Sequence, residues 1–162
     1  MISTNIELFL LRPVFILLFI LILPYYLAVY LDSYLHLSNF FIYPSNLIGL
    51  AIATLGIILD VYTVREFLKA KGTPMPWKPP KGLITTGPFQ YTRNPIYFSW
   101  AVMIAGVAIF TNLLALFIII PIFMATVHFG VVIWEERKLE KTYGKRYLEY
   151  KRKVPRWIPK LW

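Results

Sequence analysis

The chain has 162 residues, of which 58% are hydrophobic and only 15% are charged, and its mean hydropathy is +0.61. Soluble domains have about 45–50% apolar and about 25% charged residues, so the composition excludes an ordinary soluble protein, and it also excludes a disordered chain. The net charge is +9 and cysteine is absent, which excludes disulfides, a thiol nucleophile and a cysteine-ligated metal. The sequence therefore predicts a single all-α integral-membrane domain over residues 1–162.

Two apolar runs in the first half of the chain are each long enough to cross a bilayer. The first, over about residues 12–31, ends in a cluster of tyrosines instead of the small-residue cleavage site of a signal peptide, so we expect a retained membrane span. The second covers about residues 45–64 and contains one acid, Asp60. Both have the roughly 20 residues that a membrane helix needs.

The third apolar run covers residues 96–134 and has 39 residues, with one polar break at Thr111-Asn112. A single helix of that length would measure about 58 Å, nearly twice the thickness of the hydrocarbon core. We therefore predict a helical hairpin that turns at the polar break, with spans at about residues 96–111 and 113–134.

The basic residues support four spans independently. With that count, all 17 Lys and Arg residues fall on one side of the membrane, and the loop over residues 32–44 and the tip of the hairpin contain none. The positive-inside rule makes this side cytoplasmic, so both termini are predicted to be cytoplasmic. The positive charge then reflects topology and attraction to anionic lipids, and we expect no nucleic-acid partner.

A Pro/Gly-rich segment over residues 72–97 separates the second span from the hairpin. Its prolines and glycines exclude a regular helix or strand through most of its length. Its aromatic residues need surface to bury, which favours an ordered loop over a disordered one, and long ordered loops are usually functional. On the predicted topology this loop is cytoplasmic.

The tail from Glu135 onward is predicted to continue the last span as a helix that is interrupted near Gly144. Tyr143, Tyr147 and Tyr150 follow with helical spacing and form one aromatic face among charged residues. We expect an amphipathic cytoplasmic helix that either lies on the membrane or packs over the loops.

Arg93, Asn94 and Pro95 carry two compatible interpretations. Asn94 is a good N-cap and Pro95 a good first helical residue, so the pair can simply begin the third span. A helix N-terminus with Arg93 beside it is also an anion-binding arrangement.

Acidic and imidazole groups near the end of the last span form a second candidate cluster. His128 and Glu135 are seven residues apart and share a helical face, and one of the adjacent residues Glu135 and Glu136 is expected to face the protein, because neighbours on a helix are about 100° apart. The alternatives are a surface pair for Glu136 and a hydrogen-bonded interior histidine at His128.

Asp60 is expected to pair with Arg65, Arg93 or His128, in a structural or a functional role. The two histidines, His36 and His128, are assigned to opposite sides of the membrane, so we predict no metal site.

Two blocks of the sequence together resemble a known superfamily. They are GPFQYTRNPIY, residues 87–97, and EERKLEKTYGKRYLEYKRKVPRWIP, residues 135–159. Their order and their separation by a membrane hairpin are similar to the isoprenylcysteine carboxyl methyltransferase and phospholipid methyltransferase superfamily. The family pattern is G-P-[YF]-x-[YF]-x-R-[HN]-P-x-Y before the hairpin and E-E-x-x-L-x-x-x-[YF]-G-x-x-Y-x-x-Y with a V-P tail after it. The resemblance covers roughly residues 72–159.

The resemblance implies an integral-membrane methyltransferase that uses S-adenosylmethionine and releases S-adenosylhomocysteine. It places the cofactor between about residues 72–97 and 128–159, with Arg93 and Asn94 near its carboxylate and Glu135 or Glu136 at its amino group. Many family members have histidine at the position of Asn94. The catalytic residues implied are Arg93, Glu135 and Glu136. The cofactor-binding residues implied are Gly87, Tyr91, Arg93, Asn94, Pro95, Tyr97, His128, Glu135, Glu136, Tyr147, Tyr150 and Arg156.

The methyl acceptor is expected to be lipid-like and to enter from the bilayer: a prenylated cysteine carboxylate, a phospholipid amine or another lipid. No obligatory protein partner is predicted. One alternative is an NADPH-dependent membrane reductase of the sterol-reductase type, but the chain lacks the cysteine of that pattern and has Tyr147 where its tryptophan would fall. A second is a small four-span transporter with Asp60 as its coupling acid, which leaves the ordered loop and tail unexplained.

Overall fold

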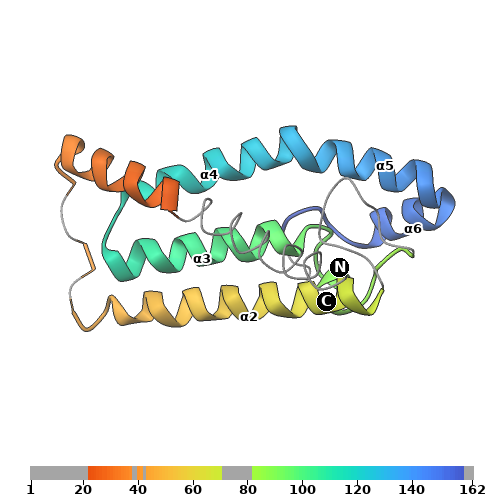
Figure 1. Ribbon diagram of the computed structural model, residues 1–162, viewed down its shortest axis with the longest axis horizontal. Helices are drawn as coiled ribbons and strands as arrows, with labels where there is room; N and C mark the ends of the chain where they lie inside the picture. The colour runs from red at the N-terminus through yellow and green to blue at the C-terminus, as the bar shows by residue number, and fades with distance from the viewer. Residues whose placement is uncertain (1–21, 38–39, 42, 71–81, 159–162) are drawn as a thin grey trace, which may run out of the picture.

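The computed structural model describes residues 22–37, 40–41, 43–70 and 82–158, and all regular structure in these ranges is helical (Figure 1). Residues 12–21 of the first predicted span and residues 72–81 of the predicted loop lie outside the described residues. The helices are residues 22–35, α2 (Leu47–Lys69), α3 (Pro95–Thr111), α4 (Ala115–Val127), α5 (Ile133–Tyr143) and α6 (Lys145–Lys153), with the short turns η1 (Gly87–Gln90) and η2 (His128–Val132).

Within the described residues, two helices are long and apolar enough to cross a membrane: α2 with 23 residues, and a continuous 29-residue helix, Ala115–Tyr143, that joins α4, η2 and α5. α3 is apolar but has 17 residues. Only 17% of the most apolar window of each long helix is buried within the protein, so most of their apolar side chains point outward, as expected for helices surrounded by lipid. The all-helical prediction is confirmed, and α2 continues five residues past the predicted end of its span.

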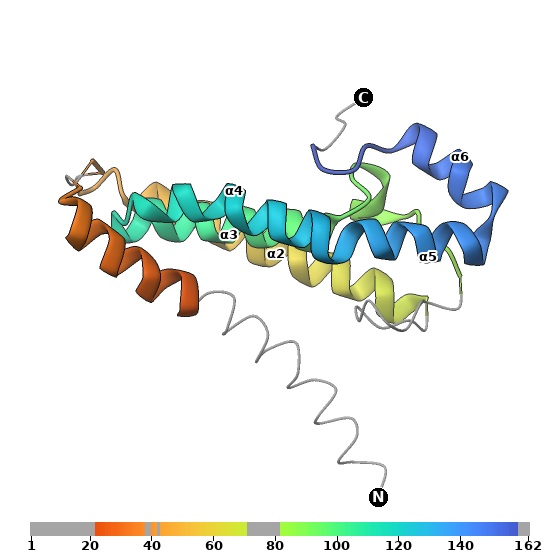
Figure 2. The same ribbon diagram turned by 90° about the horizontal axis from the view of Figure 1, so that it is seen from above.

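α2 and α3 lie side by side because small residues allow their backbones to approach closely (Figures 1 and 2). A Cβ atom added at Gly49 would collide with the backbone nitrogen of Phe110, and one at Gly106 would collide with that of Ala53. Small residues serve the same purpose between helices in lipid, where packing and not water exclusion drives association.

The predicted hairpin turn is present between α3 and α4. Asn112 adopts the left-handed conformation with φ 60°, and its Oδ1 accepts hydrogen bonds from the backbone nitrogens of Phe40 and Phe41, each at 3.0 Å. The Asp32 carboxylate accepts a 2.9 Å hydrogen bond from the backbone nitrogen of Ala115, the first residue of α4. This end of the bundle is therefore held by polar side chains that satisfy helix termini.

The tail also follows the prediction. α5 ends at Tyr143, Gly144 has a positive φ of 54°, and α6 then folds back beside the end of the bundle (Figure 2). Tyr147 and Tyr150 are buried, and the Tyr150 hydroxyl donates a 2.7 Å hydrogen bond to the carbonyl of Phe89 in η1. Of the two predicted placements, α6 takes the one in which it packs over the loop. The π-type turn η2 was not predicted.

Candidate functional site

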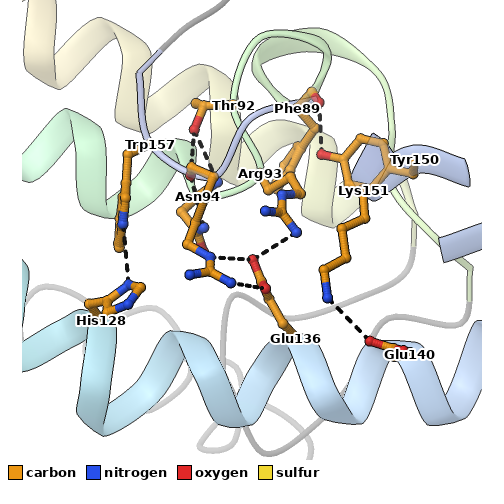
Figure 3. Close-up of polar contacts among 11 residues, drawn as sticks. Phe89, Thr92, Arg93, Asn94, His128, Glu136, Glu140, Tyr150, Lys151 and Trp157 are labelled. Carbon is orange, nitrogen blue, oxygen red and sulfur yellow. Dashed lines mark hydrogen bonds and ion pairs between the residues drawn. The ribbon is translucent and has the colours of Figure 1, made fainter. Parts of the chain in front are cut away.

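The candidate site lies where α3 begins, beside α5, and where the chain returns after α6 (Figures 2 and 3). Residues 154–158, the C-terminal strap, run across the residues that precede α3. The backbone nitrogen of Arg93 donates to the Pro155 carbonyl at 2.9 Å, and Thr92 Oγ1 and Asn94 Nδ2 both donate to the Arg156 carbonyl at 3.0 Å. These bonds hold the strap against the start of α3.

Glu136 on α5 is the centre of the site. Its side chain is only 7% exposed, and its two oxygens accept hydrogen bonds from Arg156 Nε at 3.0 Å and Arg156 Nη2 at 2.8 Å. Arg93 Nη1 lies 3.0 Å from the same carboxylate. A buried carboxylate needs such compensation, and a two-point arginine contact supplies it with defined geometry. This buried ion triad of Arg93, Glu136 and Arg156 joins the segment before α3 to α5 and the strap. Figure 3 shows the contact of Arg93 with Glu136.

Arg93 has hydrogen-bonding capacity left over. Its side chain is 9% exposed, and neither Nε nor Nη1 makes a hydrogen bond within the part of the chain that the structure describes, although Nη1 is at ion-pair distance from Glu136. A buried donor without an acceptor costs about 1–3 kcal/mol. The Nε of Arg93 is therefore a donor that an anionic or carbonyl group of a ligand could satisfy.

Two tyrosines of α6 close one side of this triad. Burial, followed by the nearby Glu136 carboxylate, raises the pKa of Tyr147 to about 12. Burial likewise raises the pKa of Tyr150. The hydrogen bonds that Arg156 donates to the Glu136 carboxylate raise the pKa of Arg156. Near neutral pH the site thus combines fixed guanidinium charges with neutral phenols.

The sequence predicts that one of the two glutamates faces the protein; Glu136 does so, and Glu135 makes a contact of its own. Tyr97 on α3 donates its hydroxyl to Glu135 Oε2 at 3.3 Å, while Glu136 contacts the two arginines. The physical reason is that α5 has α3 on one side and the strap on another, so each glutamate meets a different neighbour. The alternative of a surface pair for Glu136 is wrong, because Glu136 is buried.

His128 contacts the strap through Trp157. Trp157 Nε1 donates to His128 Nδ1 at 3.3 Å (Figure 3). An indole nitrogen is only a donor, so the neutral imidazole carries its proton on Nε2. The interpretation of a hydrogen-bonded interior histidine therefore describes His128, and its Nδ1 is already an acceptor.

Asp60 does not pair with Arg65, Arg93 or His128 as expected. Its Oδ1 accepts from Ser99 Oγ and from Trp100 Nε1, each at 3.1 Å. Both donors are on α3, because the helix face that carries Asp60 is turned toward that helix. Within the described residues no ion pair involves Asp60.

The remaining predicted residues differ in how closely they join the site. Asn94 is the N-cap residue and Pro95 the first residue of α3, as predicted, but the Asn94 side chain makes no capping bond and binds the strap instead. Tyr91 is 49% exposed and has no hydrogen bond to the ion triad. Gly87 has a φ of 59° and lies against Glu66, where an added Cβ atom would be 2.9 Å from Glu66 Cγ.

Sequence reasoning missed Glu66, Thr92 and Trp157. Glu66 is 6% exposed and accepts hydrogen bonds from Thr86 Oγ1 and Lys69 Nζ, both at 2.6 Å, which attaches the end of α2 to the start of η1. An acid just past an apolar run looks like an ordinary surface charge. Thr92 and Trp157 lie inside the two blocks that resemble the family pattern, and this location could have marked them as candidate site residues.

The fold and the site define the class of protein. The described residues form an all-helical structure with long apolar helices and a cluster of buried charged side chains at one end. The sequence model of the phospholipid methyltransferase family matches residues 44–146, which is more than half of the chain, and the chain belongs to this family. Membership indicates a membrane methyltransferase and confirms the resemblance to the superfamily. Neither a curated protein nor a solved structure matches the chain.

The matched range begins just before α2 and ends in the first turn of α6. It includes Arg93 and both glutamates, whereas the buried tyrosines of α6 and the strap with Arg156 lie beyond it.

Proposed function

We propose that this chain transfers a methyl group from S-adenosylmethionine to a lipophilic acceptor that reaches the site from the bilayer. Family membership supports methyl transfer. The observation that carries the cofactor assignment is the buried ion triad, in which Arg93 Nη1 pairs with Glu136 while Arg93 Nε has no hydrogen-bond partner among the described residues.

The residues of the site fit this cofactor. Its methionine part is a zwitterion that needs one cationic and one anionic partner. Arg93 would hold the carboxylate through its guanidinium group, whose Nε has no hydrogen bond within the described residues. Glu136 already binds two guanidinium groups, whereas Glu135 has one hydrogen bond from Tyr97, so we assign the amino group to Glu135 and the positioning of Arg93 to Glu136. When bound, the cofactor supplies an electrophilic methyl group on a sulfonium.

The aromatic residues near the triad suit the rest of the cofactor. Tyr97, Tyr147 and Tyr150 are buried or half-buried, and aromatic faces favour both an adenine ring and a sulfonium cation. Alignment and exclusion of water would be the main contributions of these side chains to the reaction. His128 is not suited to serve as a base, because its Nδ1 accepts from Trp157.

For the topology we propose four membrane spans with the site on the cytoplasmic side. Support comes from the two long apolar helices, from the apolar α3, and from the helix at residues 22–35 that continues the first predicted span. The ion triad lies at the end of the bundle where the basic residues gather, which is the side that the positive-inside rule makes cytoplasmic.

The test is calorimetric titration of S-adenosylmethionine and S-adenosylhomocysteine into detergent-purified protein, with NADPH as a control ligand. We expect saturable binding of the first two, loss of binding in Arg93→Ala and Glu135→Ala, and normal binding in Arg152→Ala, an exposed arginine of α6. Folded protein that binds neither compound would overturn the proposal. Binding of NADPH instead would favour the reductase.

A further inference from the structure

Asp60 stands out because it lies within the apolar helix α2 and has no cationic partner among the described residues. An acid at membrane depth is costly and is usually retained for a function. Its two contacts are neutral donors on α3, the hydroxyl of Ser99 and the indole nitrogen of Trp100. The question is which of these donors depends on Asp60.

Ser99 does not depend on it. The Ser99 hydroxyl has a single proton and lies 2.6 Å from the carbonyl of Ile96, closer than the 3.1 Å to Asp60. For Trp100, in contrast, Asp60 is the acceptor that the structure gives to the indole nitrogen. The Asp60 carboxylate therefore acts mainly on the orientation of the Trp100 ring.

The Trp100 ring in turn contacts a residue of the candidate site. Trp100 and Tyr97 are one turn apart on α3, and their rings meet edge to face with centroids 5.6 Å apart and an angle of 85°. Tyr97 donates its hydroxyl to Glu135. Asp60 on α2 is thus connected to Glu135 on α5 by a continuous series of contacts through the two aromatic residues of α3.

We propose that Asp60 is a positioning residue: its hydrogen bond fixes Trp100, and Trp100 fixes Tyr97 in the orientation that binds Glu135. The row from Asp60 to Tyr97 lies deeper along α3 than the ion triad, and both rings are half-buried. A lipophilic acceptor that comes from the bilayer would pass these rings before it reaches the triad. An effect of Asp60 on binding of the acceptor rests on the proposed function. Its effect on the orientation of Tyr97 does not.

The primary test measures Tyr97 directly, without any ligand. Tyrosine labelled with 13C at Cζ reports on the hydrogen bond of each hydroxyl in detergent-solubilised full-length protein, and Tyr97→Phe assigns the resonance. We expect Asp60→Ala and Trp100→Phe to shift the Tyr97 resonance, because each removes one partner of the indole hydrogen bond. Asp60→Asn, which keeps an acceptor oxygen, is expected to restore it. Ser99→Ala is the matched control and is expected to leave it unchanged.

A second measurement tests the acceptor side. Transfer of radiolabelled methyl from S-adenosylmethionine is followed with vesicles of phosphatidylethanolamine and phosphatidylglycerol, or with the same vesicles containing a farnesylated cysteine. We expect Asp60→Ala to raise the KM for the acceptor lipid by about fivefold or more. The Kd for S-adenosylmethionine should rise as well, because Tyr97 orients Glu135, to which we assign the amino group of the cofactor. Asp60→Asn is expected to recover most of the KM.

The outcomes separate the two proposals. An unshifted Tyr97 resonance in folded Asp60→Ala protein overturns the positioning role. A Tyr97 resonance shifted as far in Asp60→Asn as in Asp60→Ala also overturns it, because the charge of Asp60 and not its hydrogen bond would then matter. Failure of wild-type protein to bind S-adenosylmethionine overturns the proposed function but leaves the Tyr97 measurement valid.

Discussion

Two carboxylates are buried or half-buried beside α3, and the protein compensates them in opposite ways. Glu136 is bound by two guanidinium groups, one from the residue that precedes the N-cap of α3 and one from the strap. Asp60 is bound only by a hydroxyl and an indole nitrogen, both from α3 itself. The charged cluster joins segments that are distant in the sequence, whereas the neutral contacts orient one aromatic ring.

This difference decides what happens when either acid is changed. Removal of the Glu136 charge leaves two arginines, one of them buried, without their counter-ion. Removal of the Asp60 charge leaves no uncompensated charge. The predictions below test this comparison, in order of decreasing effect on stability.

The largest effect is expected for Glu136→Gln. Breaking a buried ion pair by neutralising one partner costs about 3 kcal/mol or more, so the thermal unfolding midpoint in detergent should fall by several degrees. The control is Glu149→Gln, an exposed glutamate of α6. Equal midpoints for the two variants would mean that the triad does not hold the strap in place.

A pH-dependent effect is expected at Tyr147. Its pKa is raised from 10.0 to about 12 in the folded protein, so the folded state keeps the phenol proton at pH values where the unfolded chain loses it. The associated stability is complete below pH 10 and is lost as the pH rises to about 12. Between pH 9 and pH 11, the free energy of unfolding of wild type should therefore fall by about 1 kcal/mol more than that of Tyr147→Phe, which lacks the phenol.

The measurement is the unfolding midpoint from pH 9 to pH 11, with Tyr91→Phe as the exposed control. Parallel curves for wild type and Tyr147→Phe would contradict the prediction.

A smaller loss is expected for Tyr150→Phe. It removes the 2.7 Å hydrogen bond to the Phe89 carbonyl but keeps the ring in place, which costs about 1 kcal/mol. Limited proteolysis should also cut the α6 region faster, because this bond attaches α6 to η1. A variant as resistant as wild type would show that ring packing alone holds α6.

The smallest effect on stability is expected for Asp60→Asn, below about 1 kcal/mol, because the amide oxygen can still accept from Trp100 and no cation loses its partner. A loss as large as that of Glu136→Gln would break the comparison and indicate that Asp60 has a cationic partner. Both variants should be measured in the same detergent by the same thermal scan.

Local signals in the sequence predicted much of the fold. The polar pair Thr111-Asn112 interrupted an apolar run and predicted the hairpin turn, and Gly144 predicted the break between α5 and α6, because both depend on the conformational preferences of a few adjacent residues. The resemblance of two sequence blocks to the family pattern placed Arg93, Glu136 and Arg156 around one expected cofactor, but it did not predict that they pair with one another.

The pairing of individual side chains was decided only by the tertiary structure. Helical spacing shows which residues share a face, but the rotation and shift of one helix against another determine which neighbour each residue meets. Asp60 could not be assigned to Trp100, 40 residues away, until α2 and α3 were placed together through Gly49 and Gly106. Local composition was enough to predict the apolar helices, the break at Gly144 and the available charges. Only the packed helices and the strap decided that Glu136 neutralises two arginines, that Glu135 binds Tyr97, and that Asp60 binds no cation among the described residues.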